Sequence, residues 1–493
     1  MLFNSVEFAI IFLPVTLVVY FFLNQKRLAI AANAWLLGAS IFFYGWWDVR
    51  YVALILGSIL FNYTIGNLIV DNSTLKKKKL STKAIFVFGI IVNIGFLGYF
   101  KYTDFFIANL NAVCKTSIPL LHIVLPIGIS FFTITQIAFL VDCYEGLVEE
   151  RKLLNYAMFV TFFPHLLAGP ILHHKDMMPQ FDVTRNKVVN YRNLTLGLFL
   201  FLLGLFKKQV IADTLAPLAD TGFASANILT LLEAWVTSLS YTLQLYFDFS
   251  GYSDMAIGIG LMFNIILPVN FNSPYKAKNI IDFWKRWHIT LTNFITTYVY
   301  TPLLKSFGKV TFYNSLAAIF LAMIIAGLWH GAGWTFIIWG GMHGAALVVN
   351  HLWKKRKLAM NPALAWFVTF MFVNISFVFF RAKNIRGAFD LLAGMAGMHG
   401  FTLPMNWAKR FAILSQYGAV FGRVYGNING HGDVAFMFAL LPVVFMMRNS
   451  MALADKRSFS LSLKSQCLTV LLILVNLLYL NSIQSKEFLY FDF

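Results

Sequence analysis

The chain has 493 residues, of which 59% are hydrophobic and only 12% are charged, about half the charged fraction of a soluble domain. This composition excludes a water-soluble fold and predicts a polytopic membrane protein. The formal net charge is +18, but the cations form no single patch, which argues against a nucleic-acid-binding protein. They fall in short clusters between apolar runs, the pattern of cytoplasmic loops: Lys26-Arg27, Lys76 to Lys79, Lys207-Lys208, Lys285-Arg286 and Lys354 to Lys357.

Candidate membrane-spanning segments follow one another along the whole chain, since a spanning helix needs roughly 20 apolar residues. They cover residues 7–23, 29–45, 51–70, 84–101, 121–141, 154–170, 193–211, 229–247, 252–268, 312–328, 334–352, 362–380, 433–447 and 466–483. Only helices satisfy their own backbone polar groups in lipid without a closed barrel. We therefore expect an all-α fold with about eleven crossings, re-entrant and interfacial helices, and a single transmembrane domain over residues 1–493.

The first apolar segment has no basic n-region and no A-x-A cleavage site, so it is predicted to be a retained first span. Because Lys26 and Arg27 follow it, we place the N-terminus outside the cytoplasm. The long polar insertion at residues 384–432 is also placed outside, where a partner could dock.

The sequence offers little for a metal. Cys114, Cys143 and Cys467 lie far apart with no C-x-x-C pair, which supports neither a disulfide framework nor a zinc site. His173, His174 and Asp176 stand close together, but ligand histidines on a helix are usually spaced as in H-E-x-x-H, and adjacent histidines point apart. We predict a surface loop here and no metal centre.

A run that is rich in polar residues, YFDFSGYSD, lies at residues 246–254 between apolar stretches. On a helix, Asp248 and Tyr252 share a face at spacing four, while Gly251 divides the run. Two interpretations stay open: a polar seam between packed helices, or the wall of a hydrated tunnel that includes Tyr246.

A basic and aromatic segment follows at residues 268–294. It places Lys285 and Arg286 between Trp284 and Trp287, an arrangement typical of an interfacial segment at the cytoplasmic face. Topology alone would account for the charges, but such a surface also suits a polyanionic substrate such as coenzyme A. His288 closes the basic part of this segment and is either a structural hydrogen-bonding residue or a functional one.

His330 stands in the apolar stretch AGLWHGAGWTFIIWGGMHG at residues 326–344. The flanking glycines allow close approach of backbone or substrate, and Trp329 belongs to a set of tryptophans that could wall a pocket. An imidazole suits proton abstraction from a hydroxyl at physiological pH, so His330 is a candidate general base, whereas His343 is interpreted as a packing residue. The sequence has no G-x-S-x-G, H-E-x-x-H, Walker A or G-x-G-x-x-G motif, which argues against an ATP-driven pump.

Three stretches of the chain resemble the membrane-bound O-acyltransferase family: FDFSGYSDMAIGIGLMFN, NFNSPYKAKNIIDFWKRWHITLTNFITTYVYTPL and GLWHGAGWTFIIWGGMHG. The nearest branch is that of the bacterial alginate O-acetyltransferase membrane subunit and its peptidoglycan- and cellulose-acetylating relatives. FNSVEFAIIFLP, FPHLLAGPI, FVFFRA and EFLYFDF extend the likeness over most of the chain. Two positions depart from the branch: His165 replaces an expected Gln, and Thr296-Thr297 replace an expected Arg-Asp pair.

The resemblance implies a fold with a central funnel in the bacterial inner membrane, a cytoplasmic acetyl-CoA donor and an extracytoplasmic acceptor, without a metal. The family's invariant histidine maps onto His330, and a second functional histidine onto His288. Acetyl-CoA binding is expected from Lys285, Arg286, Trp284, Trp287, Tyr246 and Trp329. We also expect an SGNH-type or acyl-relay partner outside, and His330 acts either as general base or as a transient acetyl carrier. The rivals are a secondary transporter or flippase of the same pathway, and a non-enzymatic scaffold.

Overall fold

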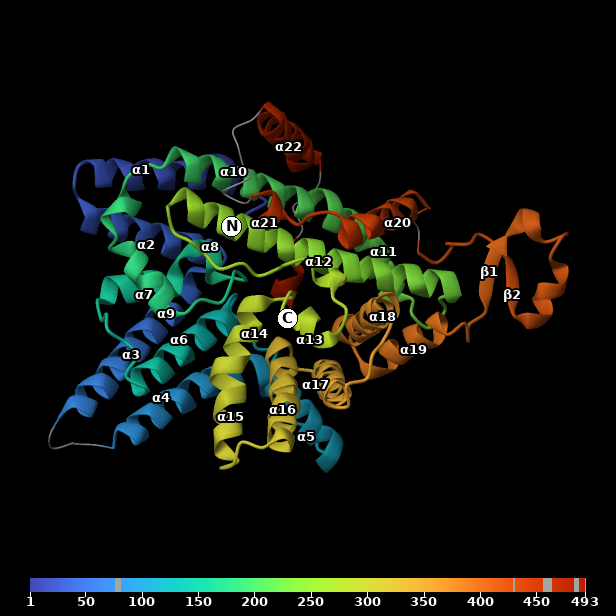
Figure 1. The fold of residues 1–493 in the computed structure, drawn as a ribbon, viewed down its shortest axis with the longest axis horizontal. Coiled ribbons are helices and arrows are strands. Elements are labelled where there is room, and N and C mark those ends of the chain that lie inside the picture. Colours follow the sequence, from blue (N-terminus) through green and yellow to red (C-terminus); the bar gives the residue numbers. More distant parts are fainter. Residues whose placement is uncertain (76–80, 429–430, 455–462, 483–486, 493) are drawn as a thin grey trace. The chain divides into compact units, whose positions relative to one another are not determined.

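The computed structural model describes residues 1–75, 81–428, 431–454, 463–482 and 487–492 (Figure 1). Within these ranges, six helices are long and apolar enough to cross a membrane: Glu7–Gln25, Val49–Thr74, Thr82–Cys114, Tyr191–Ala224, Phe312–His330 and Pro362–Arg381. Shorter apolar helices span Ala29–Gly45, Ile129–Tyr144, Gly432–Met446 and Gln466–Tyr479. The chain is thus an all-α, multi-pass membrane protein; the figure of eleven crossings stays a prediction. The basic cluster Lys76 to Lys79 lies outside the described residues.

The chain divides into two compact units that are interleaved in sequence. Unit 1 holds residues 1–205, 252–269 and 454–492, and unit 2 holds residues 206–251, 270–453 and 493. All the site residues predicted from the sequence belong to unit 2.

Unit 1 consists mainly of the N-terminal helices. Among them, α1 packs on α2, and α6 packs on both α3 and α4. Its helices are α1 Leu13–Gln25, α2 Ala29–Gly45, α3 Val49–Thr74, α4 Thr82–Leu97, α5 Thr103–Cys114, α6 Ile129–Tyr144, α7 Leu153–Thr161, α8 Phe163–Leu166, α9 His174–Met177, α10 Tyr191–Phe206 and α22 Leu463–Ser482. Shorter helical turns cover Glu7–Phe12, Gly98–Tyr102, Met178–Phe181, Thr184–Lys187 and Leu489–Asp492.

Unit 2 carries the rest of the elements. Its helices are α11 Asp213–Ala224, the first part of α12 Leu231–Met262, α13 Ile280–Trp284, α14 Ile289–Ile295, α15 Thr301–Ser306, α16 Phe312–His330, α17 Trp334–Lys355, α18 Pro362–Arg381, α19 Ile385–Met395, α20 His431–Met446 and α21 Ser450–Leu453. Shorter helical turns cover Lys207–Ala212, Pro274–Lys276, Thr296–Tyr300, Met405–Trp407 and Ala412–Tyr417. Strands β1 Phe401–Pro404 and β2 Ala419–Gly422 form a parallel pair in which Phe401 faces Ala419.

Several helix boundaries follow from local sequence. The expected segment 29–45 matches α2, and the Asp48 carboxylate caps α3 by accepting a hydrogen bond from the backbone N–H of Arg50. The expected span 154–170 is instead broken into α7 and α8, with Phe162 outside helical geometry and Pro164 in the first turn of α8. The expected span 121–141 becomes helical only at Ile129, after Gly128 adopts a φ of 73°.

The expected spans 229–247 and 252–268 are one continuous helix, α12, of 32 residues. Gly251 lies inside it and does not divide the run, contrary to the sequence-based interpretation. A glycine inside a helix costs only about 1 kcal/mol relative to alanine, and the burial of its neighbours along α12 outweighs that cost. The helix ends near Asn264, which has a φ of 61°.

Lys207 and Lys208 do not lie in a loop, so their assignment to a cytoplasmic connection is wrong. They begin a π-helical turn between α10 and α11, and both are buried. The Lys208 ammonium lies 2.6 Å from Asp248 Oδ1 and 2.9 Å from Asp213 Oδ1. A charge can stay inside the protein when its partners neutralise it, and two carboxylates do so here.

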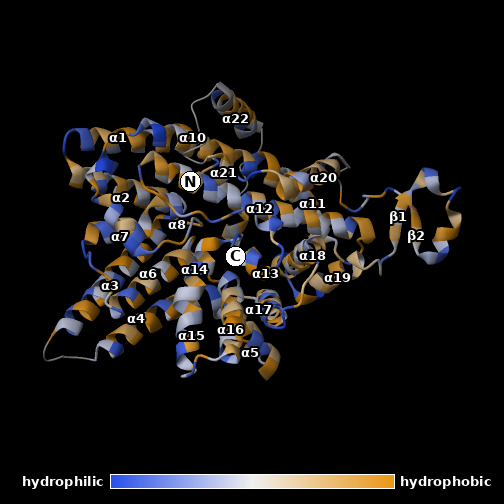
Figure 2. Cartoon of the chain, viewed as in Figure 1, coloured by the Kyte–Doolittle hydropathy of each residue, from blue (hydrophilic) through white to orange (hydrophobic). Residues whose placement is uncertain are grey.

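α16 and α17 form a tight helical hairpin, and α15 runs beside α16 (Figure 1). A Cβ added to Gly340 would lie 2.4 Å from the Met323 carbonyl oxygen and 3.2 Å from Gly327 Cα. Backbones that approach this closely need small residues at the crossing, as is usual between membrane helices. Figure 2 shows hydrophobic residues along α16, in keeping with a membrane-spanning helix.

Candidate active site

Aromatic side chains from four helices of unit 2 gather around three histidines. Trp284 ends α13, His288 precedes α14, His330 ends α16, and Trp339 and His343 lie on α17. Phe377 and Phe380 come from the last turn of α18. The cluster therefore brings together residues that lie up to about a hundred positions apart in the sequence.

His330 faces the interior of the protein, not lipid. Its side chain is 5% exposed, and it shares the buried face of α16 with Ala322 and Ala326, at spacings of four residues. The exposed face of the same helix carries Leu321, Ile325 and Leu328. The imidazole ring packs edge-on against three aromatic rings, with centroid distances of 4.9 Å to Trp329, 5.2 Å to Trp339 and 5.2 Å to Phe380.

His288 has an unusual backbone geometry and lies beside the Asn270 side chain. Its φ of 43° lies in the left-handed region, and its side chain is 1% exposed. The Asn270 side-chain oxygen accepts from the Thr290 backbone N–H at 3.2 Å and lies 3.1 Å from His288 Nδ1. Because that oxygen only accepts, Nδ1 carries the proton, and Nε2 is the basic nitrogen of the neutral ring.

Both ring nitrogens of His343 form hydrogen bonds to other side chains of the protein. Trp284 Nε1–H donates to His343 Nδ1 at 3.2 Å, so the proton sits on Nε2, which donates to Ser376 Oγ at 2.9 Å. The ring is fully buried. These bonds agree with the packing role expected from the sequence and add that His343 fixes the orientation of Trp284.

Two routes of ring contacts connect the segment around Trp284 to His330. In the first, Trp284 lies 5.9 Å from Trp339, which contacts His330. In the second, Trp287 lies 5.3 Å from Phe377, Phe377 lies 6.2 Å from Phe380, and Phe380 contacts His330. The structure thus places Trp284, Trp287, Trp329 and His330 in one aromatic cluster.

Tyr246 joins the same cluster from α12. Its ring is 5.2 Å from Tyr275 and 6.4 Å from Trp287, and the Lys207 ammonium lies 6.0 Å above it. The neighbouring Asp248 pairs with Lys208, which supports the interpretation of the YFDFSGYSD run as a polar seam between helices. The tunnel wall remains a prediction.

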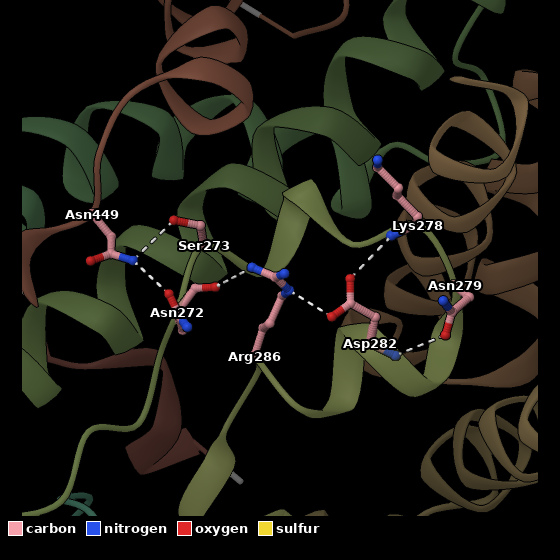
Figure 3. Close-up of polar contacts among 7 residues, drawn as sticks. All are labelled: Asn272, Ser273, Lys278, Asn279, Asp282, Arg286 and Asn449. Carbon is pink, nitrogen blue, oxygen red and sulfur yellow. Dashed lines mark hydrogen bonds and ion pairs between the residues drawn. The ribbon is translucent and has the colours of Figure 1, made fainter. Parts of the chain in front are cut away.

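Lys285 and Arg286 are adjacent in sequence but differ in their contacts. The Arg286 guanidinium lies 2.8 Å from Asp282 Oδ1 and donates to the Asn272 carbonyl, and Asn449 donates to the Asn272 side chain (Figure 3). Arg286 therefore ties the loop before α13 to α13 itself. Lys285 is exposed and lies at a cavity.

This cavity of about 330 Å³ lies between α13, α14, α16 and α17. Trp284 and Lys285 line it from α13 and the residue after it, Thr292 and Thr296 from α14 and the following turn, and Ala322, Met323 and Ala326 from α16. Ala326 stands one helical turn before His330 on the same face. His288 and His330 are not among the lining residues, but Trp284 lines the cavity and also contacts His343.

His174 lies in unit 1 and pairs with a buried carboxylate. The His174 Nδ1 atom lies 2.9 Å from Asp142 Oδ2, with both side chains buried, so His174 is not part of an exposed surface loop. In the described ranges, no three His, Cys, Asp or Glu side chains gather as metal ligands would.

Two structural partners of the site were not found from the sequence. Asn270 fixes the tautomer of His288 from 18 residues away, and Ser376 bonds His343 from a separate helix. Neither has a local pattern that points to its partner, because the contacts depend on how α13, α17 and α18 pack.

The amino-acid sequence is similar to those of known proteins. The sequence model of the membrane-bound O-acyltransferase family matches residues 20–386. The chain is 44% identical to a peptidoglycan O-acetyltransferase of Helicobacter pylori, over 100% of this chain and 98% of that protein. It is 35% identical to a probable alginate O-acetylase AlgI of Azotobacter vinelandii over the full length of both, and 40% identical to the Pseudomonas aeruginosa protein of that name over 80% of this chain and 75% of that protein.

Proposed function

Because the chain belongs to the membrane-bound O-acyltransferase family and is an O-acyltransferase, we propose that it transfers acetyl groups from cytoplasmic acetyl-CoA to an acceptor outside the cytoplasm, for O-acetylation of a cell-envelope polysaccharide. Its relatives are a peptidoglycan O-acetyltransferase and probable alginate O-acetylases, which supports acetyl as the group and a polysaccharide as its destination. The bacterial inner membrane is the location that such a donor and acceptor require.

The 330 Å³ cavity supports the assignment of the donor site. Its walls are mostly apolar, with Lys285 exposed beside it, so the cavity suits the thin pantetheine arm while the ammonium attracts the phosphates. Arg286 serves this site by holding the loop that leads into α13. Trp284, oriented by His343, walls the inner part of the cavity together with Ala326, one turn from His330.

The proposed chemistry is direct acyl transfer. His330 accepts the proton of an acceptor hydroxyl, whose oxygen attacks the thioester carbonyl; the new C–O bond forms, the C–S bond breaks, and the departing coenzyme A thiolate takes up the proton. His288 and the indole N–H groups stabilise negative charge on the carbonyl oxygen or orient the thioester. In the alternative, a His330 ring nitrogen attacks the thioester, so that a C–N bond forms as the C–S bond breaks and the thiolate leaves. The acceptor oxygen then displaces the imidazole, so that the C–O bond forms as the C–N bond breaks, and the hydroxyl proton passes to the imidazole nitrogen. The acceptor hydroxyl belongs either to the polymer or to an SGNH-type relay protein outside.

One observation carries this proposal: the apolar cavity beside Lys285 runs along the same face of α16 that presents His330 to the interior. An exposed His330 on the lipid-facing stripe of α16 would have favoured a packing role. A buried His330 at the end of a cavity-lining face favours chemistry.

The test uses cells that depend on this chain for ester-linked acetate on their surface polysaccharide. We expect His330→Asn to lower mild-base-releasable acetate and thiol release from acetyl-CoA by about 10²–10⁴-fold, the usual contribution of a general base. His122→Asn is the matched control, because His122 is exposed and has a φ of 49° that asparagine accepts. A His330→Asn protein that is present at normal level and acetylates at near wild-type rate would end the proposal.

A further inference from the structure

A second cavity in unit 2, of about 460 Å³, lies between the loop before α13, the end of α17 and the start of α18. It shares the helices α13 and α17 with the cavity beside Lys285, but the two cavities have no lining residue in common. Its lining includes Lys278 and Asn279 before α13, Asn350, Trp353 and Lys354 of α17, and Val368 of α18.

Part of the wall of this cavity is apolar and open to the surroundings of the protein. Val349, Trp353, Leu358 and Val368 line the cavity, and their exposed fractions are 59%, 37%, 49% and 48%. Val368 belongs to α18, which is long and apolar enough to cross a membrane. A ligand with acyl chains would therefore cover apolar surface here that a purely polar ligand would leave uncovered.

The cavity lies at the end of the α16 and α17 hairpin that carries the basic cluster Lys354 to Lys357. This cluster is predicted to mark the cytoplasmic side of the membrane. The Lys355 ammonium lies 4.2 Å from the centre of the Phe312 ring, so the start of α16 is at the same end. Trp353 next to the cluster is typical of the boundary between lipid and water. We therefore expect the cavity at the level of the phospholipid headgroups on that side.

Two cations that line the cavity have no carboxylate partner among the described residues, Lys278 and Lys354. Figure 3 shows the Lys278 side chain extending away from Asp282, which accepts a hydrogen bond from the Lys278 backbone N–H at 3.4 Å. The Asp282 carboxylate instead pairs with Arg286 at 2.8 Å. Both lysine ammonium groups are exposed, so they can attract an anionic phosphate.

Asn350 adds a hydrogen-bond acceptor to the lining. Its side-chain oxygen is buried and accepts no hydrogen bond from the part of the chain that the structure describes. A buried acceptor without a donor is costly, so a ligand that brings a hydroxyl group would satisfy it. The lining thus combines two cations, one unused acceptor and an exposed apolar wall.

We propose that this cavity binds an anionic phospholipid whose headgroup carries hydroxyls, of the phosphatidylglycerol type, from the cytoplasmic leaflet. Lys278 and Lys354 hold the phosphate, a headgroup hydroxyl donates to Asn350 Oδ1, and the acyl chains lie along the exposed apolar wall. This lipid site is independent of the proposed function, because it is argued from residues that take no part in the proposed chemistry.

The lining selects this occupant over two others that also carry phosphate. The two lysines repel the headgroup cation of phosphatidylcholine or phosphatidylethanolamine, whereas a phosphatidylglycerol headgroup has no cation. The nucleotide of coenzyme A shares the phosphate chemistry but has no acyl chains, so it would leave the exposed apolar wall uncovered.

The test is native mass spectrometry of the full chain in detergent, titrated with three lipids that have the same acyl chains. We expect phosphatidylglycerol to bind at least about tenfold more tightly than phosphatidylcholine, since the latter carries a cation. Phosphatidylmethanol is anionic but has no hydroxyl, and we expect it to bind about two- to ten-fold more weakly than phosphatidylglycerol. Asn350→Ala should remove this difference between the two anionic lipids.

The double variant Lys278→Gln/Lys354→Gln should lose about tenfold in affinity for phosphatidylglycerol. Lys305→Gln/Lys309→Gln is the matched control, because both of these lysines are exposed, stand shortly before the start of α16 and do not line the cavity. We expect this control to bind phosphatidylglycerol as the unchanged chain does.

Four outcomes would overturn the inference. Equal binding of phosphatidylglycerol and phosphatidylcholine, or an equal loss in the two double variants, would mean that the lipid contacts only a general surface charge. Equal binding of phosphatidylglycerol and phosphatidylmethanol would remove the contact with Asn350. Displacement of phosphatidylglycerol by acetyl-CoA at similar concentration would assign the phosphate site to the nucleotide instead of a lipid.

Discussion

His288 and His343 belong to the same aromatic cluster and are equally buried, yet their hydrogen bonds assign them different roles. His343 donates from one nitrogen to Ser376 and accepts at the other from Trp284, so neither nitrogen is available for chemistry. Asn270 fixes His288 at Nδ1, and in this tautomer Nε2 is the basic nitrogen.

Burial alone therefore does not distinguish the two histidines. What distinguishes them is the partner of Nδ1, which is an acceptor, Asn270 Oδ1, in His288 and a donor, Trp284 Nε1–H, in His343, so that the two rings are opposite tautomers. A histidine whose Nδ1–H is held by an acceptor presents Nε2 as its basic nitrogen, which is the arrangement that general acid–base chemistry needs.

The variant His288→Asn tests this comparison most directly, because it should have the largest effect on activity. We expect the rate of thiol release at saturating acetyl-CoA to fall about 10²-fold, the loss typical of removing one transition-state hydrogen bond. Asparagine accepts the left-handed backbone at this position, so the unfolding temperature in detergent should change little. His122→Asn, also at a left-handed position, shows what the substitution alone does.

A His288→Asn protein with normal turnover but a lowered unfolding temperature would reverse the assignment and make His288 the packing residue. A loss of turnover with an equal loss of stability would leave the two histidines alike. Either result removes the distinction drawn from their hydrogen bonds.

The complementary prediction concerns His343 and Trp284. His343→Phe removes the acceptor of the Trp284 N–H and the donor to Ser376, and should lower the free energy of unfolding by about 1–3 kcal/mol. Trp284→Phe should cost a similar amount. Both changes remove the same hydrogen bond, from Trp284 Nε1–H to His343 Nδ1. The double variant should therefore be less destabilised than the sum of the two single variants, and a double-mutant cycle in detergent measures that coupling. Strict additivity would mean that His343 does not position Trp284.

Much of the fold follows from the sequence, because apolar length and charge clusters set the spanning helices. The boundaries of α2 and the helical hairpin of α16 and α17 are of this kind. The misplaced features depend on distant partners. Lys208 looks like a loop cation until Asp213 and Asp248 neutralise it, and Gly251 looks like a break until the packing around α12 keeps the helix intact.

The candidate site likewise has features that the sequence predicts and features that depend on distant partners. His330, His288 and the tryptophans stand out in the sequence because they are polar or aromatic residues within runs of apolar residues. The different contacts of Lys285 and Arg286 cannot be predicted from the sequence. They depend on Asp282, one turn away, and on the backbone carbonyl of Asn272, which both contact Arg286. Two adjacent cations are equivalent in the sequence, and only their neighbours show that one is committed and the other exposed.

The difference between the exposed Lys285 and the paired Arg286 leads to the prediction with the smallest expected effect, which is on the KM for acetyl-CoA. Lys285→Gln should raise the KM for acetyl-CoA by about two- to five-fold without changing kcat, the size expected for one exposed charge near a phosphate. Acetyl-pantetheine lacks the nucleotide phosphates, so its KM should not respond, and added salt should shrink the effect on acetyl-CoA. Lys305→Gln, an exposed cation at the end of α15 that does not line the cavity, is the matched control. If Lys305→Gln raises the KM as much, or if acetyl-pantetheine responds equally, the basic rim acts only as a general surface charge and Lys285 has no specific contact with the donor.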